Sequence, residues 1–119
     1  MLVQVHTDPH IQGGASLQDW VKTEVGGSLE RFQPQLTRVE VFLSDLNSHK
    51  PAQNDQSDKQ CKLEARWAGL DPIVVSKTTD NVKTAVGAAL DALILTLDSR
   101  IEKMRDAKRH PTPTETGEV

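Results

Sequence analysis

The chain has 119 residues, which is enough for one domain with a modest core. Its formal net charge of −3 gives no general reason to expect a nucleic-acid-binding protein. The single cysteine, Cys61, excludes an internal disulfide and any multi-cysteine metal site. Hydrophobic residues make up only 36% of the chain, but they are clustered, so we expect a folded protein.

The N-terminal part of the chain predicts a strand followed by a helix. Leu2–His6 alternates apolar and polar residues, as a half-buried strand does. Ser16, followed by Asp19 three residues later, resembles a capping box that opens a helix. Gly26-Gly27 in the middle of this helix predicts either a bend or a close approach by another segment. The residues that recur on one face of the helix are Leu17, Trp20, Val21, Val25, Leu29 and Phe32.

Three further strands are predicted from alternating residues. Thr37–Ser44 is the second strand, and the polar stretch 45–59 that follows is expected to be a long, flexible connection. Gln60–Ala68 alternates again, and Gly69–Pro72 marks a turn. A fourth strand begins at Ile73 and is expected to end near residue 77.

The longest predicted element is a helix from Thr79 to about Arg109. Thr79 or Asp80 is expected to act as its N-cap, because a short side-chain oxygen accepts from the first free backbone N–H groups. At 1.5 Å per residue the helix would be about 45 Å long and would need a broad apolar surface to pack on. Its apolar residues recur at helical spacing: Val82, Val86, Leu90, Leu93, Leu97, Ile101 and Met104.

Together these elements predict an α+β fold in the order β-α-β-β-β-α. A βαβ unit followed by two antiparallel strands gives a four-stranded mixed sheet, with both helices packed on one face. We expect one domain over residues 1–109 and a disordered tail over residues 110–119. Met1–His6 resembles no signal peptide and no segment is apolar enough to span a bilayer, so a cytoplasmic protein is expected.

The sequence gives little support for an enzyme or a metal site. The run Ser44–Lys50 contains Ser, Asp and His, but three residues of one loop rarely adopt the geometry of a catalytic triad. His6 and His10 fall in a strand and a loop, so the helical spacing that would bring two ligands together is missing. Cys61 is expected to be a small buried residue. We therefore predict no catalytic residue, no metal and no cofactor.

The aromatic residues favour core packing over contact with nucleic acid. Trp20, Trp67 and Phe32 all fall on the apolar faces of their predicted elements. Base stacking on these rings is the less favoured interpretation. Phe42 lies on the opposite face of its strand from Val41 and is expected to be exposed.

Three segments carry a resemblance to a known family. Leu29-Glu30-Arg31-Phe32 closes the first predicted helix, and Val39–Leu43 forms the second predicted strand. In the long helix, Ala85-Val86-x-x-Ala89-Leu90-Asp91-x-Leu93 is similar to the pattern A-I-x-x-L-I-D-K-L. These segments and the element order resemble the ribosome hibernation promoting factor and ribosome-associated inhibitor family (sigma-factor modulation proteins). The resemblance extends to about Arg109 and corresponds to the short form, without a C-terminal dimerisation domain.

The resemblance implies a non-enzymatic factor in the decoding region of the small ribosomal subunit, where basic residues on both helices contact rRNA phosphates. At positions where the family is basic, the long helix here has Ala92, Leu95-Thr96 and Asp98. The first helix has Glu24 and Gly27. The candidate rRNA-binding residues are the cations that remain: Lys22, Arg31, Lys83, Arg100, Lys103, Arg105, Lys108 and Arg109.

Two functions remain open from the sequence. The first is a translation-modulating factor that binds the small ribosomal subunit through the long helix. The alternative is a diverged dimeric protein-interaction domain without rRNA binding, favoured by Leu95, which lies off the main apolar stripe. Residues 100–109 carry a net charge of +3, against −4 for residues 1–99. This basic end fits either a phosphate contact or a complement to the negative end of the helix dipole.

Overall fold

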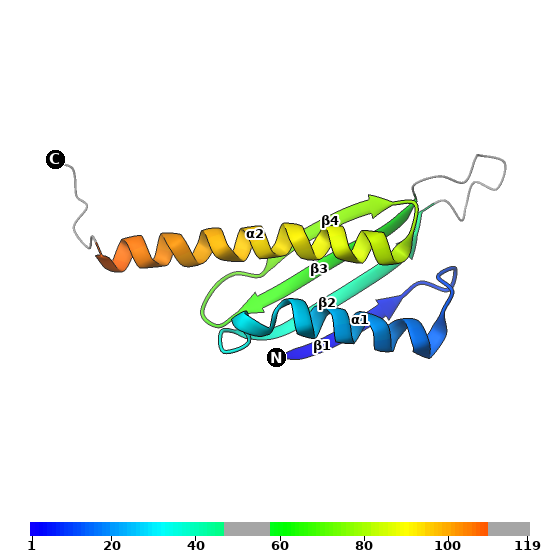
Figure 1. Ribbon diagram of the computed structural model, residues 1–119, viewed down its shortest axis with the longest axis horizontal. Coiled ribbons are helices and arrows are strands. Elements are labelled where there is room, and N and C mark those ends of the chain that lie inside the picture. Colours follow the sequence, from blue (N-terminus) through cyan, green and yellow to red (C-terminus); the bar gives the residue numbers. More distant parts are fainter. Residues whose placement is uncertain (47–57, 110–119) are drawn as a thin grey trace.

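The computed structural model describes residues 1–46 and 58–109, with side chains up to residue 105. The predicted α+β fold and element order are confirmed, apart from an added 3₁₀ helix, η1. The predicted connection 45–59 lies largely, and the tail 110–119 entirely, outside the described residues. The elements in Figure 1 are β1 (Leu2–Thr7), α1 (Gly14–Ser28), η1 (Glu30–Phe32), β2 (Leu36–Asp45), β3 (Lys59–Trp67), β4 (Ile73–Thr79) and α2 (Val82–Arg109).

The four strands form one mixed sheet in the order β1-β2-β3-β4. β1 runs parallel to β2, and the remaining neighbours are antiparallel. The register pairs Val3 with Val39 and Val5 with Val41, so the apolar residues of β1 and β2 lie side by side. Both helices cover the same face of this sheet and begin at the same end of the molecule (Figure 1). The predicted layering is therefore confirmed.

One continuous core lies between the sheet and the two helices. From Val39 to Leu43 every second residue of β2 points into it, because side chains alternate between the faces of a strand. Trp67 and Phe32 are buried as predicted, and Trp20 is partly exposed. The largest fully buried side chains are Phe32, Leu29, Leu36, Leu43, Leu63, Leu93, Leu97, Val21, Val25, Val39, Val41 and Val86.

The first helix differs from its prediction at both ends. It begins at Gly14 after Gly13, which has φ +124° and gives no side-chain cap, so the predicted Ser16 capping box is wrong. It ends at Ser28, and Leu29 donates its N–H to the Val25 carbonyl before η1 begins. Gly26 and Gly27 therefore lie in the last turn, where a Cβ atom would meet open space. The glycines mark the end of a helix and accommodate no close neighbour.

The second helix starts three residues later than predicted. Its N-cap is Asn81, whose Oδ1 accepts hydrogen bonds from the backbone N–H groups of Lys83 and Thr84 at 2.8 and 3.2 Å. The Thr79 hydroxyl instead accepts from the N–H of Asn81 and donates to its carbonyl. Thr79 thus stabilises the turn before the helix, and the predicted cap at Thr79 or Asp80 is wrong.

We expect Leu93→Ala to reduce the free energy of unfolding by about 2–5 kcal/mol, since Leu93 is fully buried in mid-helix. Leu95 is 72% exposed on the same helix, so Leu95→Ala serves as the matched control and should change stability little. Chemical denaturation of both variants measures the difference. Equal losses would contradict the helix register described here.

Candidate nucleic-acid interface

The densest set of cations in the sequence lies on the last turns of α2. This part of the helix extends past the turn between β3 and β4 (Figure 1). Arg105 and Lys103 are exposed and Arg100 is half-buried. Within the described residues none of the three forms an ion pair with a carboxylate. Lys108 and Arg109 continue the helix, but their side chains lie outside the described part.

The helix dipole accounts for only part of this basic segment. Because α2 ends at Arg109, only Lys108 and Arg109 fall clearly within its last turn. Dipole effects fall off within that turn. Arg100 and Lys103 lie farther from the end, so their charges are not explained as a complement to the dipole.

Arg31, another candidate, is held in a two-pronged ion pair. Its Nη1 and Nη2 atoms donate to the Asp98 carboxylate at 2.9 and 3.0 Å. This hydrogen-bonded contact raises the pKa of Arg31 and lowers the pKa of Asp98. The guanidinium also lies 4.2 Å from the centroid of the Phe32 ring. Arg31 is therefore neutralised locally and links η1 to α2.

Arg31 and Arg105 line one hollow where α2 leaves the sheet. The hollow has a volume of about 550 Å³. The buried rings of Phe32 and Trp67 contribute to its lining, together with Ile101, Met104 and Gln35. Two of the eight predicted site residues are thus brought together, around a partly apolar surface.

Lys22 and Lys83 are both exposed in the helical layer but lie on different sides of α1. The Lys83 ammonium lies 4.9 Å from the centroid of the Trp20 ring, so this side of α1 faces α2. Lys22 follows Trp20 by two residues, which is about 200° around a helix. Lys22 therefore points away from α2, and it cannot share a contact with Lys83.

The sheet face opposite the helices offers few free cations. Arg38 and Glu40 form an ion pair, and so do Arg66 and Glu64, at 3.6 Å. Phe42, expected to be exposed, is partly covered: His6 stacks on its ring, with the centroids 4.9 Å apart. These contacts leave the end of α2 as the better candidate for a phosphate contact.

Comparison with known sequences decides the family. The family described as sigma 54 modulation protein / S30EA ribosomal protein matches residues 3–106. The chain belongs to this family. No curated protein sequence matches the chain at a significant level.

Two solved structures share the fold of this S30EA-family chain. A ribosomal subunit interface protein from Coxiella burnetii is 11% identical, with a TM-score of 0.63 over 86% of this chain and 99% of that one. The N-terminal domain of Protein Y from Thermus thermophilus is 16% identical, with a TM-score of 0.59 over 78% of this chain and 91% of that one. At these identities the likeness shows the fold.

The S30EA family is non-enzymatic, so the predicted absence of catalysis is confirmed by membership. The segment Ser44–Lys50, which contains Ser, Asp and His in one run, lies partly outside the described residues. In the described part of the chain, no three His, Cys, Asp or Glu side chains gather as a metal site requires. Among the same residues, no helix is long and apolar enough to cross a membrane.

Acidic residues occupy the surface between the two helices of this S30EA-family chain. Glu24 follows Trp20 by one helical turn and so lies on the side of α1 that faces α2. Asp91 and Asp98 are seven residues apart and lie on one side of α2. These carboxylates repel phosphates, so the middle of the helical layer is a poor place for RNA, and the end of α2 is a better one.

The lone cysteine is inaccessible to chemistry in the folded state. Cys61 is fully buried, and burial raises the pKa of its thiol to about 12. Because the thiolate is the reactive form, we expect a thiol reagent to modify the native protein very slowly at neutral pH. The unfolded protein in denaturant should react at the rate of a free cysteine. Fast modification of the native protein would contradict the burial of Cys61 in β3.

Proposed function

We propose that this protein binds the small ribosomal subunit in the cytoplasm and modulates translation. Membership of the S30EA family supports ribosome association. The two structural neighbours include a protein named as a ribosomal subunit interface protein, which agrees with this proposal. In this proposal residues 1–109 form the binding domain, and no cofactor takes part.

The observation that carries the proposal is the projecting basic end of α2. Arg100, Lys103 and Arg105 lie on the last turns of α2 and have no carboxylate partners in the described structure. Lys108 and Arg109 follow on the same helix. Such a segment reaches phosphates without a clash from the domain, and its +3 charge contrasts with the acidic remainder of the chain. The contact is therefore concentrated in one segment.

Salt dependence tests this proposal directly. Each phosphate contact releases counterions, so the logarithm of the binding constant should fall with the logarithm of salt, by about 0.7 to 0.9 per contact. We expect cosedimentation of the purified protein with isolated small subunits at low salt and its loss as salt rises. Large subunits serve as the control particle. No cosedimentation at low salt, or equal binding to both subunits, would contradict the proposal.

A second function is favoured by one observation. Leu95 is 72% exposed in the middle of α2, at a position where the family pattern is basic. An exposed leucine on a helix face fits a protein partner, such as a second copy of the chain, better than it fits RNA. Sedimentation equilibrium of the wild type and of Leu95→Lys tests this alternative. A wild-type dimer that the variant converts to a monomer would favour it, and a wild-type monomer would reject the homodimer.

A further inference from the structure

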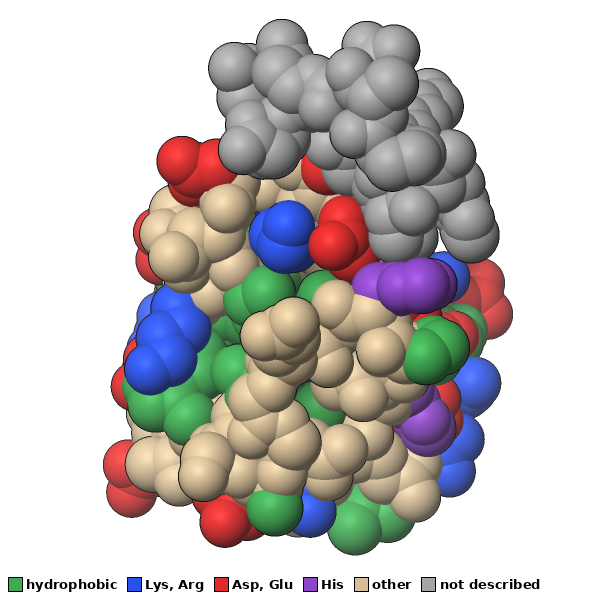
Figure 2. Space-filling view, turned by 90° about the vertical axis from the view of Figure 1, so that its right-hand side faces the viewer, with side chains coloured by type: hydrophobic (Ala, Val, Ile, Leu, Met, Phe, Trp, Pro, Cys, Tyr) green, Lys and Arg blue, Asp and Glu red, His purple; other side chains and the backbone are tan. Residues whose placement is uncertain are grey.

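A hollow lies between the beginnings of the two helices, at the end of the molecule opposite the basic segment. Its volume is about 450 Å³, within the range of about 300–1,000 Å³ typical of small-molecule sites. Figure 2 looks onto this end of the molecule, where apolar side chains line the floor of a depression. The lining residues come from α1, the start of β3 and the start of α2: Gln12, Gly13, Ser16, Leu17, Trp20, Lys59, Asp80, Asn81, Val82 and Lys83.

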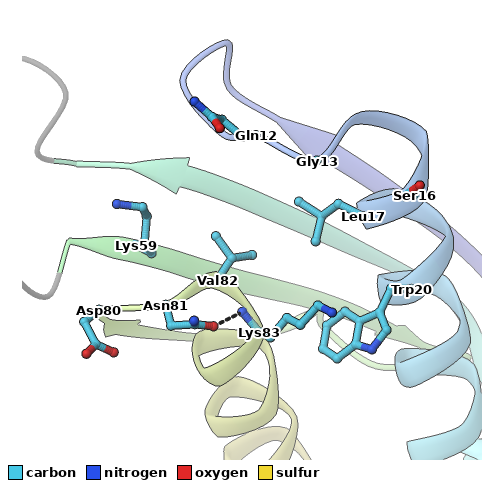
Figure 3. Close-up of a pocket in the computed structure, with 10 residues that line it drawn as sticks. All are labelled: Gln12, Gly13, Ser16, Leu17, Trp20, Lys59, Asp80, Asn81, Val82 and Lys83. Carbon is cyan, nitrogen blue, oxygen red and sulfur yellow. Dashed lines mark hydrogen bonds between the residues drawn. The ribbon is translucent and has the colours of Figure 1, made fainter.

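Trp20 and Lys83 form one wall of this hollow. In Figure 3 the Lys83 side chain extends from α2 toward the indole on α1, and its ammonium lies 4.9 Å from the ring centroid. Trp20 is only partly buried, although its position on the apolar face of α1 predicts core packing. Lys83 forms no ion pair with a carboxylate in the described part of the chain. The Lys83 ammonium therefore lies over one face of the partly exposed indole, and both groups line the hollow.

The floor of the hollow is apolar, whereas its rim is polar. Leu17 on α1 and Val82 at the start of α2 extend into the space between the two helices (Figure 3). Lys59 stands across the hollow at the start of β3 (Figure 3) and pairs with Asp45 at 3.4 Å. Asp80 lines the rim, but its carboxylate points away from Trp20 and Lys83 in Figure 3. The wall formed by Trp20 and Lys83 thus keeps its positive charge.

We propose that this hollow binds a nucleotide unit, with the base against Trp20 and the apolar floor and the phosphate on Lys83. A planar base gains about 1–3 kcal/mol by stacking on an aromatic side chain. The phosphate forms a charge-assisted contact with the ammonium, as lysines do in many phosphate sites. Ser16 and Asn81 supply polar groups at the rim.

The backbone adds to the attraction for a phosphate. Both helices begin at this hollow, and neither has an acidic residue in its first turn. α1 also lacks a side-chain cap, so its first N–H groups remain available as donors. The positive ends of the two helix dipoles then reinforce the charge of Lys83. The backbone N–H groups and helix dipoles thus add to the attraction that the side chains of the cavity exert on a phosphate.

The nucleotide unit has two sources with the same chemistry: a free mononucleotide or an unpaired nucleotide of RNA. The hollow lies at the start of α2, and the proposed rRNA contact lies at its other end. The site does not depend on ribosome binding, so the two proposals fail separately. A protein that never cosediments with ribosomes can still bind a free nucleotide here.

The two tryptophans make a specific test possible by NMR. Trp20 lines the hollow, whereas Trp67 is 6% exposed at the far end of the sheet and serves as an internal control. We expect adenosine monophosphate to shift the indole N–H signal of Trp20 in a saturable manner and to leave Trp67 unchanged. Adenosine and inorganic phosphate, titrated separately, should each bind at least about tenfold more weakly, because each makes only part of the contacts. A short oligoadenylate is titrated in the same way. If it shifts the Trp20 signal with a higher affinity than the mononucleotide, RNA is the source of the nucleotide unit.

Matched variants separate this site from general attraction of anions. Lys83→Met keeps the length of the side chain and removes its charge, and should weaken binding about tenfold through loss of one charge-assisted contact. Lys62→Met removes the same charge from the outer face of the sheet and should leave the affinity unchanged. The proposal would be overturned if both variants weakened binding equally. It would also be overturned if neither nucleotide probe shifted the Trp20 signal in a saturable manner, or if inorganic phosphate bound with the same affinity as the mononucleotide.

Discussion

Reversing the charges of Arg100 and Lys103 together (R100E/K103E) is expected to abolish cosedimentation with small ribosomal subunits. Both side chains lie on the last turns of α2 and have no carboxylate partner in the described structure. Each reversal removes one phosphate contact and places a repelling charge in the same position. We expect the affinity at low salt to fall at least about 100-fold, to the limit of detection in a sedimentation assay.

The fold of this variant should remain intact. Both positions are on the surface of α2, with Lys103 exposed and Arg100 half-buried, and surface substitutions usually change stability by no more than about 0.5 kcal/mol. Circular dichroism and the melting temperature of the same preparation measure this. A lowered melting temperature with unchanged binding would instead support a structural role for these cations.

The matched control reverses two exposed lysines of the sheet, Lys62 and Lys77. It introduces the same change in net charge away from the end of α2. We expect K62E/K77E to reduce binding only slightly, through the long-range field of the protein. If the two double variants weaken binding equally, the contact is not specific to the end of α2. Lys22 and Lys83 would then be the next cations to reverse.

The fold was predictable because its apolar residues follow simple periods. The alternation in Val39, Val41 and Leu43 identifies β2, and the heptad-like spacing of Val86, Leu93 and Leu97 identifies α2. All six are buried in the structure. A slip by one residue would move every core side chain of a strand to the outer face, so the pattern determines the register as well as the element.

The helix ends were harder to predict because several residues there can act as caps. Thr79, Asp80 and Asn81 all have side-chain oxygens suited to capping, and only the backbone conformation selects Asn81. The residue before α1 is Gly13, which has a positive φ and no side chain. It therefore gives no capping pattern from which the start of the helix could be predicted. The starts of both helices therefore differ by two or three residues from their predicted positions.

The candidate site depends on contacts between residues that are distant in sequence. Arg31 and Asp98 are separated by 67 residues, and no local pattern indicates that they meet. The sequence indicated Arg31 as a candidate rRNA-binding cation and Asp98 as an acidic residue at a position that is basic in the family pattern. It did not indicate that Asp98 neutralises Arg31. Similarly, the spacing of Trp20 predicted core packing, whereas the structure leaves it beside Lys83.

Asp98→Lys is expected to strengthen binding to the small subunit by about tenfold or more at low salt. The substitution restores a basic residue at a position where the family pattern has one. It also removes the carboxylate that accepts two hydrogen bonds from the Arg31 guanidinium, at 2.9 and 3.0 Å. The guanidinium then becomes available to a phosphate. One substitution therefore adds a cation and releases another. Cosedimentation across a range of salt concentrations measures the gain in affinity. The slope of the logarithm of the binding constant against the logarithm of salt should become steeper by about 0.7 to 0.9 for each contact added.

Asp91→Lys is the matched control for this gain. Asp91 lies on the same side of α2 and undergoes the same charge change, but forms no ion pair with Arg31. We expect it to strengthen binding less than Asp98→Lys, because it leaves Arg31 neutralised. The double variant Asp98→Lys/Arg31→Gln should fall back to the level of Asp91→Lys. If Asp98→Lys and Asp91→Lys give the same gain, Arg31 makes no contact with RNA even when released, and the interface is confined to the end of α2.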